Sequence, residues 1–298
     1  MIDLVGVPFD GMGRSGAQAN APAALRAAGL LDAVRGRVAE QLDLQLPPPS
    51  PHRARTTGLL NEAALVEMVS QVRTQTAEAL DRQHFPLVYG GDCSVLLGAI
   101  PALRAQAGTA GLVFLDGHED ATPMERSTSG EAANMEIAIL LGRTGADAPA
   151  PLQLAHGLLR PDELAVLGPR DRSYREPLGV ESIADAVWFR AGDAVAGDPV
   201  GTAREAADHV SSSTTDWWLH VDLDVLSKDE FGSCGAPDEP ALAGGLSWSQ
   251  LSAAVQVLLP SPGCRGWSLA VYNPDLDQDG RDARSVVGLI AEGVKRIA

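Results

Sequence analysis

The sequence predicts an α/β protein in which one parallel β-sheet is covered by helices on both faces. Short apolar runs alternate with Ala-rich helical stretches along all 298 residues, and this alternation is typical of parallel strands joined by crossover helices. No shift in composition divides the chain, and no segment repeats at a solenoid period. We therefore expect residues 1–298 to form one domain.

The first third of the chain is expected to contain one strand and two helices. The apolar run 2–7 reads as the opening strand. Pro22 suits the first turn of a helix, where its missing N–H is not needed, and the Ala-rich residues 23–28 continue that helix. Residues 47–51 (PPPSP) form a stiff loop that cannot join a sheet ladder. Asn61 is expected to cap a long helix whose apolar residues recur at helical spacing: Leu65, Met68, Val69 and Val72.

Strands and helices alternate regularly in the rest of the chain. Each expected strand is a compact apolar run bounded by turn residues, and the runs cover residues 87–89, 112–115, 164–167, 217–221 and 267–271. The expected helices cover residues 95–103, 131–141, 199–210 and 248–259, with a last helix from Asp282 onward. Residues 145–151 are expected to be a surface loop.

Composition and charge exclude several classes of protein. Hydrophobic residues make up 45% of the chain, which is enough for a sizeable core. With 23 Lys+Arg against 39 Asp+Glu, the net charge of −16 disfavours both nucleic-acid and anionic membrane partners. No apolar stretch approaches the roughly 18 residues of a membrane-spanning helix, and Asp3 stands where a signal peptide would be positive. The three cysteines argue against a disulfide framework, so we expect a cytoplasmic protein.

Polar residues collect where three of the expected strands end. These clusters are residues 90–94 (GGDCS), 116–120 (DGHED) and 222–224 (DLD). In open parallel sheets, ligands bind beyond the carboxyl ends of the strands. Asp116, His118 and Asp120 alternate, so an extended or loosely turned segment would point all three the same way, and Asp222 and Asp224 share this spacing.

Five oxygen and imidazole donors indicate a metal site rather than isolated turn residues. They are too many for one tetrahedral zinc with an open position, but they suit two ions about 3.5–4 Å apart that share carboxylates and a bridging hydroxide. Carboxylates with one imidazole favour Mn²⁺, and less selectively Zn²⁺ or Fe²⁺. A lone Asp after a strand is usually a turn or helix cap. Two such clusters favour the metal, because carboxylates packed together without a cation would repel one another.

The ordered series of motifs resembles the ureohydrolase superfamily, which contains arginase, agmatinase and formimidoylglutamase. The matching segments are residues 5–10 with Gly13 and Gly16, then 22–26, 90–94, 116–120, 122–123, 129–130, 167–171, 222–224, 235–237, 244–247 and 273–274. The resemblance implies a single three-layer α/β/α domain with an eight-stranded parallel sheet, and usually a trimer or hexamer. It also implies a binuclear manganese site that hydrolyses a guanidino or amidino C–N bond.

By resemblance, six positions of this chain correspond to metal ligands: Cys93, Asp116, His118, Asp120, Asp222 and Asp224. The first ion would be held by Asp116, Asp120 and the histidine whose place Cys93 takes. The second ion would be held by His118 and Asp224, with Asp116 and Asp222 bridging. Asp120 would also act in catalysis, by orienting the hydroxide.

Several positions depart from the family pattern. Cys93 replaces a histidine, and a thiolate prefers softer metals than Mn²⁺, so the first ion could be weak, absent or replaced by zinc or iron. The proton-shuttle histidine falls on Ala133, the carboxylate that holds the substrate amino group falls on Ser173, and the glutamate that contacts the guanidinium falls on Val271. An unpaired guanidinium in such a pocket would be costly, which disfavours arginine as the substrate.

Three functions remain open at this point. The favoured one is an agmatinase-like, metal-dependent hydrolase of a small guanidino, amidino or formimino molecule, with Ser129 and Glu131 in substrate binding. Glu131 and Glu119 could be acid–base groups or merely solvated charges. The second makes Cys93 a nucleophile activated by His118, against the alternative that Cys93 is a buried thiol filling the space of the lost histidine. The third is a binding or scaffold protein without catalysis. His220 is a supporting candidate beside Asp222, provided that the strand stays regular.

Overall fold

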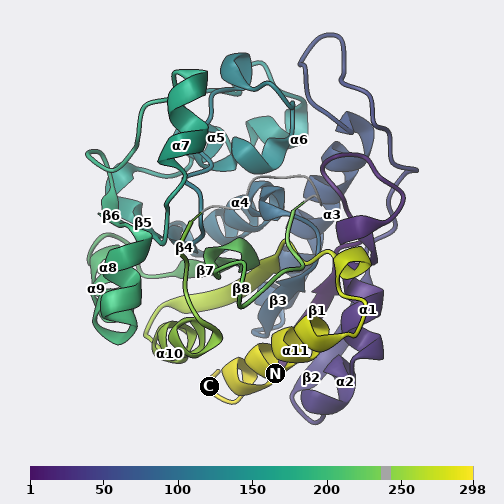
Figure 1. The fold of residues 1–298 in the computed structure, drawn as a ribbon, viewed down its shortest axis with the longest axis vertical. Coiled ribbons are helices and arrows are strands. Elements are labelled where there is room, and N and C mark those ends of the chain that lie inside the picture. Colours follow the sequence, from purple (N-terminus) through teal and green to yellow (C-terminus); the bar gives the residue numbers. More distant parts are fainter. Residues whose placement is uncertain (236–242, 298) are drawn as a thin grey trace.

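The centre of the molecule is one sheet of eight parallel strands, as expected. The computed structural model describes residues 1–235 and 243–297, and its strands follow the order β2-β1-β3-β8-β7-β4-β5-β6 (Figure 1). The strands are β1 (Ile2–Gly6), β2 (Val38–Asp43), β3 (Phe85–Tyr89), β4 (Gly111–Leu115), β5 (Leu164–Leu167), β6 (Trp188–Arg190), β7 (Trp217–Asp222) and β8 (Cys264–Ala270). All neighbouring strands pair in parallel, which confirms the predicted fold class.

Helices cover both faces of the sheet and complete a three-layer structure. The helices are α1 (Ala21–Ala27), α2 (Leu30–Ala33), α3 (Glu62–Asp81), α4 (Leu96–Ala107), α5 (Glu136–Leu140), α6 (Ala150–Gln153), α7 (Arg172–Arg175), α8 (Gly192–Gly197), α9 (Pro199–Ser213), α10 (Trp248–Leu258) and α11 (Arg281–Val294). Helices α3, α4, α5 and α6 pack on one face. Helices α1, α2 and α8 to α11 pack on the other (Figure 1).

The central strands are apolar throughout because both of their faces are buried. Along β4, Leu112 and Phe114 join the core under α3 and α4, whereas Val113 and Leu115 join the core under α9 and α10. Consecutive strand residues point to opposite faces, so a strand covered on both sides needs an unbroken apolar run. The polar residues that follow such a strand are therefore displaced to the edge of the sheet.

Two strands were not predicted, and both lie at the edges of the sheet. All residues of β2 are exposed or half-buried, and β6 has only three residues, all half-buried. The β2 sequence therefore lacks the apolar run that signals a strand, whereas the short run 186–189 (AVWF), which leads into β6, was overlooked.

Three local predictions were wrong in detail. Asn61 adopts a left-handed conformation without capping α3; its side chain instead donates to the Asp10 carbonyl and accepts from the Ser50 N–H. The expected helix over 131–141 is interrupted at Met135, because the Ile137 N–H donates to the Asp120 carbonyl. The expected loop 145–151 contains the start of α6, at Ala150.

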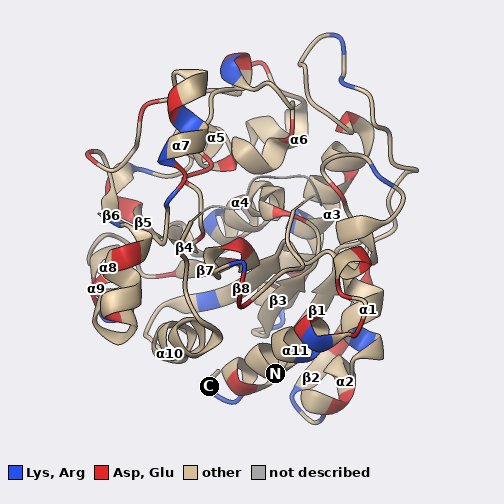
Figure 2. Ribbon diagram, in the orientation of Figure 1, with Lys and Arg blue, Asp and Glu red and all other residues tan. Residues whose placement is uncertain are grey.

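Charged residues are spread over elements on both sides of the sheet (Figure 2). Within residues 1–235 and 243–297, no helix has the length and apolar character needed to cross a bilayer. Two residues of the matching segment 235–237, Ala236 and Pro237, lie outside the described residues.

Candidate metal centre

The predicted polar clusters meet at one rim of the sheet. Strands β3, β7 and β4 lead into Cys93, Asp222 and Asp116, and only β8 separates β3 from β7 in the sheet order. The Cys93 thiol donates to Asp222 Oδ2 at 2.8 Å, and its Sγ lies 3.7 Å from Asp116 Oδ2. One buried side chain therefore contacts carboxylates from two strands that are far apart in the sequence.

The glycines of the GGDCS segment turn the chain from β3 toward the site. Gly90 and Gly91 have φ values of +86° and +67°, which glycine adopts without steric cost. The Asp92 carboxylate then accepts the Ser94 N–H and caps the short turn Cys93–Val95. As a result, the Cys93 thiol points into the rim, with 1% of the residue exposed.

One half of the site, here called the second-ion group, consists of Asp116, His118 and Asp224. Their donor atoms all lie within 4.8 Å of one another. His118 Nδ1 is 2.8 Å from Asp224 Oδ2, and the His118 N–H donates to Asp116. The Gly117 N–H donates to Asp224 at 2.9 Å.

Charge is largely balanced inside the second-ion group. Burial works against its ionisation, but the charge of His118 and the hydrogen bonds from His118 and Gly117 lower the pKa of Asp224 to about 2. Burial likewise opposes protonation of His118, yet the neighbouring carboxylates raise the pKa of this imidazole well above its usual value. The His118 imidazole therefore offsets part of the carboxylate charge of this group, although burial and the nearby Asp224 still raise the pKa of Asp116 to about 7.

The other half, here called the first-ion group, consists of Cys93, Asp120 and Glu136. Their donor atoms also lie within 4.8 Å of one another. Asp120 sits in a left-handed turn with φ +43°, an uncommon conformation for a residue other than glycine that is often found at functional sites. Sequence reasoning missed Glu136, the first residue of α5.

Charge is not balanced in the first-ion group. Burial, followed by the Asp222 and Asp116 carboxylates, raises the pKa of the Cys93 thiol. Burial and the nearby Glu136 raise the pKa of Asp120 well above its usual value. No Lys, Arg or His within the described chain forms an ion pair with Asp120 or Glu136. In this half, only protons or a metal ion can compensate the buried carboxyls.

Asp222 lies between the two groups. Its Oδ2 contacts the Cys93 thiol of the first-ion group, and its Oδ1 accepts the Asp224 N–H of the second-ion group at 2.6 Å. Burial, with Asp224 and Asp116 nearby, raises the pKa of Asp222. Asp222 therefore contacts one residue of each group, and its expected bridging role stays a prediction.

His220 points into the same rim, one strand period before Asp222. Strand β7 is regular through Asp222, and His220 forms a further group with Cys93 and Asp116. Its Nδ1 is 2.6 Å from Ser268 Oγ and its ring stacks on Phe114. Its Nε2 has no hydrogen-bond partner anywhere in the described structure. Burial lowers the pKa of His220 to about 3, so the ring is neutral.

The segment with Ser129 and Glu131 lies beside the Cys93 turn, because residues 132–134 pack against residues 93–95. Ser129 Oγ accepts the Glu131 N–H at 3.2 Å, which holds the loop in shape. The Glu131 carboxylate contributes to raising the pKa of Arg14. Both residues are thus near the centre, although neither belongs to its donor groups.

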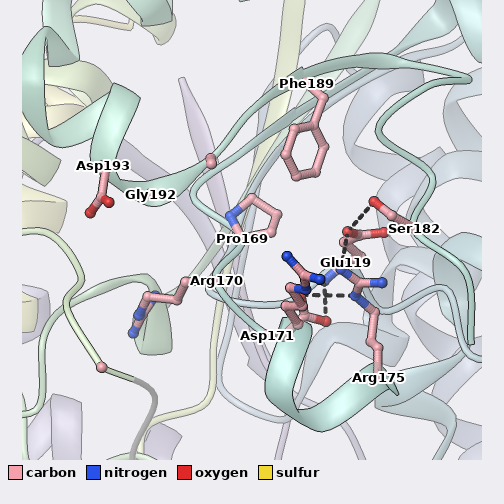
Figure 3. Close-up of a pocket in the computed structure, with 12 residues that line it drawn as sticks. Glu119, Pro169, Arg170, Asp171, Arg175, Ser182, Phe189, Gly192 and Asp193 are labelled. Atoms are coloured by element: carbon pink, nitrogen blue, oxygen red, sulfur yellow. Dashed lines mark hydrogen bonds and ion pairs between the residues drawn. The ribbon is translucent and has the colours of Figure 1, made fainter. Parts of the chain in front are cut away.

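Glu119 belongs to a separate ion-pair cluster beyond the end of β5. Its carboxylate pairs with Arg175 at 2.9 Å and accepts from the Ser182 hydroxyl (Figure 3). It also accepts from the Ile183 N–H. Arg175 also pairs with Asp171 at 3.1 Å. These three partners favour a structural role for the Glu119 carboxylate over an acid–base role.

The wall next to Cys93 is apolar. Cys93 packs with Ala270 and Val271, and Ala133 joins this cluster. Ala133 and Val271 are the positions where the resemblance placed a histidine and a glutamate. Val271 has φ +66°, a strained conformation for a β-branched residue.

Two divalent ions fit this arrangement of donors. Each group offers three donors within the spacing of one coordination sphere, and Asp222 connects the groups. Glu136 supplies a buried carboxylate whose polar neighbour is another carboxyl, that of Asp120, and no cationic side chain among the described residues pairs with it. Oxygen donors with one imidazole suit Mn²⁺ in the second-ion group, whereas a thiol in the first-ion group favours a softer ion.

Comparisons with known proteins agree with this description. A family model described as the arginase family matches residues 1–294. An arginase from Staphylococcus aureus (strain MRSA252) is 25% identical over 303 residues, which cover 97% of this chain and 95% of the relative. The solved arginase from Bacillus caldovelox superposes with a TM-score of 0.82 at 23% identity, covering 98% of this chain and 97% of that one. The formimidoylglutamase from Bacillus subtilis gives a TM-score of 0.73 at 19% identity, covering 99% and 86%.

Proposed function

The chain belongs to the arginase family of hydrolases, and on this premise we propose that it cleaves a non-peptide C–N bond in a small guanidino, amidino or formimino molecule other than arginine. The observation that carries the proposal is the convergence of two three-donor groups on Asp222 at the rim of the sheet. A site without a metal would gain nothing from so many buried carboxyls.

The second-ion group would hold one ion and the first-ion group the other. We propose Mn²⁺ for the second-ion group, with its oxygen and imidazole donors. When bound, a pair of divalent ions polarises a C–N substrate and makes a water molecule acidic enough to act as a nucleophile near neutral pH.

The side chains around the ions have distinct proposed roles. Asp120 is placed to accept a hydrogen bond from the attacking water and to orient it. Asp224 fixes the His118 ring through the 2.8 Å contact with Nδ1. Ser129 and Glu131 precede residues 132–134, which pack against the Cys93 turn, and both are proposed to contact the substrate beyond the reacting carbon.

The apolar wall argues against arginine. Val271 and Ala133 contribute no charge or hydrogen bond where a guanidinium would need one, and a desolvated cation without a partner is costly. Ser173, where the resemblance placed the carboxylate for the substrate amino group, lies exposed on α7. A smaller or neutral amidine suits this wall better.

The geometry disfavours Cys93 as a nucleophile. Its S–H donates to Asp222, and burial together with two carboxylates raises its pKa, which suppresses the thiolate needed for attack. His118, the expected activating base, is engaged with Asp224. Cys93 is better placed as a metal ligand.

The proposal is tested by screening the Mn²⁺- and Co²⁺-loaded protein against guanidino, formimino and amide compounds. The readout is release of urea, ammonia or formamide, with the Asp116→Ala variant as the control. Hydrolysis of one class, lost in the control, supports the proposal. Absence of bound metal from the purified and reconstituted protein, by elemental analysis, would contradict it and favour the scaffold role.

The expected homo-oligomer is a separate proposal, drawn from the family resemblance. A trimer or hexamer should be seen by light scattering of the purified protein. A monomer at micromolar concentration would contradict it.

A further inference from the structure

Glu136 is the most unusual buried group of the described chain. Its side chain has 0% exposure, and its carboxyl oxygens accept no hydrogen bond from the backbone N–H of another residue, an amide or a cationic side chain within residues 1–235 and 243–297. The polar group beside them is the Asp120 carboxyl, which can donate to Glu136 only while it is protonated. Two buried carboxyls that face each other without a cation are expensive, so they are retained only where something compensates them.

The backbone holds Glu136 against the metal centre. The Ile137 N–H donates to the Asp120 carbonyl at 3.1 Å, and the Thr122 N–H donates to the Asn134 carbonyl at 3.0 Å. These two bonds clamp the start of α5 onto the turn that carries Asp120. The backbone therefore fixes the Glu136 carboxyl next to Asp120 and Cys93, and its position does not depend on the free rotation of a surface side chain.

The position of Glu136 matches the change at Cys93. A cysteine side chain is much shorter than the histidine that the family resemblance places there, so the first ion would lose a donor and leave space. Glu136 is long enough to reach this space from the opposite segment, and its donor atom lies within 4.8 Å of both Cys93 Sγ and the Asp120 carboxyl.

We propose that Glu136 is a metal ligand and that, with Cys93 and Asp120, it rebuilds the first-ion position around a thiolate in place of a histidine. This inference rests on the proposed metal-dependent function. It assigns one ion to a sulfur- and oxygen-donor set that binds Co²⁺ or Zn²⁺ more tightly than Mn²⁺. The second-ion group remains a position of oxygen and imidazole donors.

A purely structural role for Glu136 makes the opposite prediction about stability. If Glu136 only filled the core, Glu136→Gln would destabilise the metal-free and metal-bound protein alike. As a ligand, Glu136 contributes a negative charge only when a cation binds, so Glu136→Gln should change the Tm of the metal-free protein little. The same variant should shrink the rise in Tm that Co²⁺ produces.

The deciding experiment titrates chelator-treated protein with Co²⁺. Stoichiometry is followed by equilibrium dialysis, and the first-ion position by the near-ultraviolet charge-transfer band between thiolate and Co²⁺. We expect two ions per wild-type chain, with a thiolate band that Cys93→Ser abolishes. In Glu136→Gln, the band should require a Co²⁺ concentration about 10- to 100-fold higher. The matched control Glu205→Gln, an exposed carboxylate on α9 that pairs with Arg190, should titrate as wild type.

A second variant keeps the test decisive if Glu136→Gln folds poorly. The double variant Cys93→His with Glu136→Ala exchanges the Cys–Glu pair for an imidazole. It should bind two ions without a thiolate band and take Mn²⁺ more readily than the wild type does.

Three results would overturn the inference. The first is an unchanged thiolate band in Glu136→Gln. The second is loss of the band in His220→Gln but not in Glu136→Gln, which would place the ion on the other side of Cys93, with Asp116 and His220. The third is a double variant that binds one ion only. A wild-type protein that binds no Co²⁺ would contradict the proposed metal-dependent function as well. The three results above contradict only the role of Glu136, so failure of the inference can be distinguished from failure of the proposed function.

Discussion

The two halves of the candidate metal centre differ in how far the protein itself satisfies their charge. In the second-ion group, the Asp224 carboxylate has His118 at 2.8 Å and the Gly117 N–H at 2.9 Å. In the first-ion group, Glu136 faces the Asp120 carboxyl without a cationic partner among the described residues, and Cys93 faces two carboxylates. The second-ion group therefore compensates more of its own charge than the first-ion group does.

The two groups therefore favour a bound metal ion for different reasons: orientation of the donors in the second-ion group, and uncompensated buried carboxyls in the first-ion group. Hydrogen bonds within the second-ion group orient its donors, and such partners tune affinity. The unsatisfied carboxyls of the first-ion group instead make a bound cation stabilising. It follows that metal removal should disturb the first-ion group more than the second.

The largest effect is expected for Asp222→Ala, which removes the carboxylate shared by both halves. Affinity for both ions should fall about 100-fold or more, because even partners that only orient ligands contribute 10- to 100-fold. Hydrolysis should fall with it. Metal content by elemental analysis and the rate of C–N cleavage measure the two effects.

The matched control is Asp216→Ala, an aspartate just before β7 that pairs with Arg265. It should keep both ions. If Asp222→Ala retained one ion at wild-type affinity, the two halves would be independent sites, and the bridging role would be wrong.

Glu119→Ala tests a buried carboxylate that has its own partners and lies outside the metal centre. Glu119 is buried and has three polar partners, and its removal leaves Arg175 with one ion pair, to Asp171, and a hydrogen bond to the Val180 carbonyl among the described residues. We expect a loss of about 3 kcal/mol in the free energy of unfolding, measured by urea denaturation. Metal stoichiometry should stay at the wild-type value in the folded variant. A loss of bound metal at unchanged stability would instead return Glu119 to the active site.

Arg170→Ala tests whether a change near the second-ion group alters the binding of the second ion alone. Arg170 Nη2 donates to the Asp224 carbonyl at 2.5 Å and to the Leu226 carbonyl at 3.0 Å, which fixes the turn that presents Asp224. Its loss should weaken the second ion by about 10-fold and leave the thiolate band of the first-ion group unchanged. Arg172→Ala, an exposed neighbour that pairs with Glu176, is the control. Equal weakening of both ions would mean that the halves are mechanically coupled.

Much of the fold could be predicted from the sequence because its central strands are buried on both faces. Residues 112–115 and 217–221 are continuous apolar runs, and the structure places them in β4 and β7. The edge strand β2 is covered less completely and has no comparable run, whereas β6 follows a run of only four apolar residues, 186–189, which sequence reasoning passed over. The polar clusters that follow the central strands predicted the position of the site at the sheet edge, because polar residues are excluded from strands that are buried on both faces.

Glu136 and His220 were harder to assign because each is a single polar residue in an apolar segment. Glu136 stands in the run Met135–Leu141, and His220 lies inside the strand 217–222. His220 was marked only as a supporting candidate by its spacing to Asp222, and Glu136 was not marked, although a single polar residue in a fully buried run is a signal for both. What the sequence could not provide is the reach of each side chain, which depends on the turn at Asp120 and on the interruption at Met135.

The smallest expected effect concerns His209 on α9, which tests whether a buried unpartnered atom is enough to define a site. Its Nε2 has no hydrogen-bond partner in the described chain, and the ring stacks on Trp188. Unlike Glu136, it belongs to none of the donor groups. Burial lowers the pKa of His209, although the Asp162 carboxylate opposes this shift. The unfolded chain therefore takes up a proton near pH 6.5 that the folded chain resists.

The contribution of His209 to stability is complete above that pH and is lost as the pH falls below it. His209→Phe keeps the stacking and removes the titration, so its free energy of unfolding should decline less than that of the wild type between pH 7 and pH 5. Both proteins are measured in chelator, so that the metal-binding carboxyls contribute equally. Identical slopes would contradict the prediction. If the metal content of His209→Phe differed from that of the wild type, a polar atom outside the donor groups would affect metal binding. The distinction between His209 and Glu136 would then be wrong.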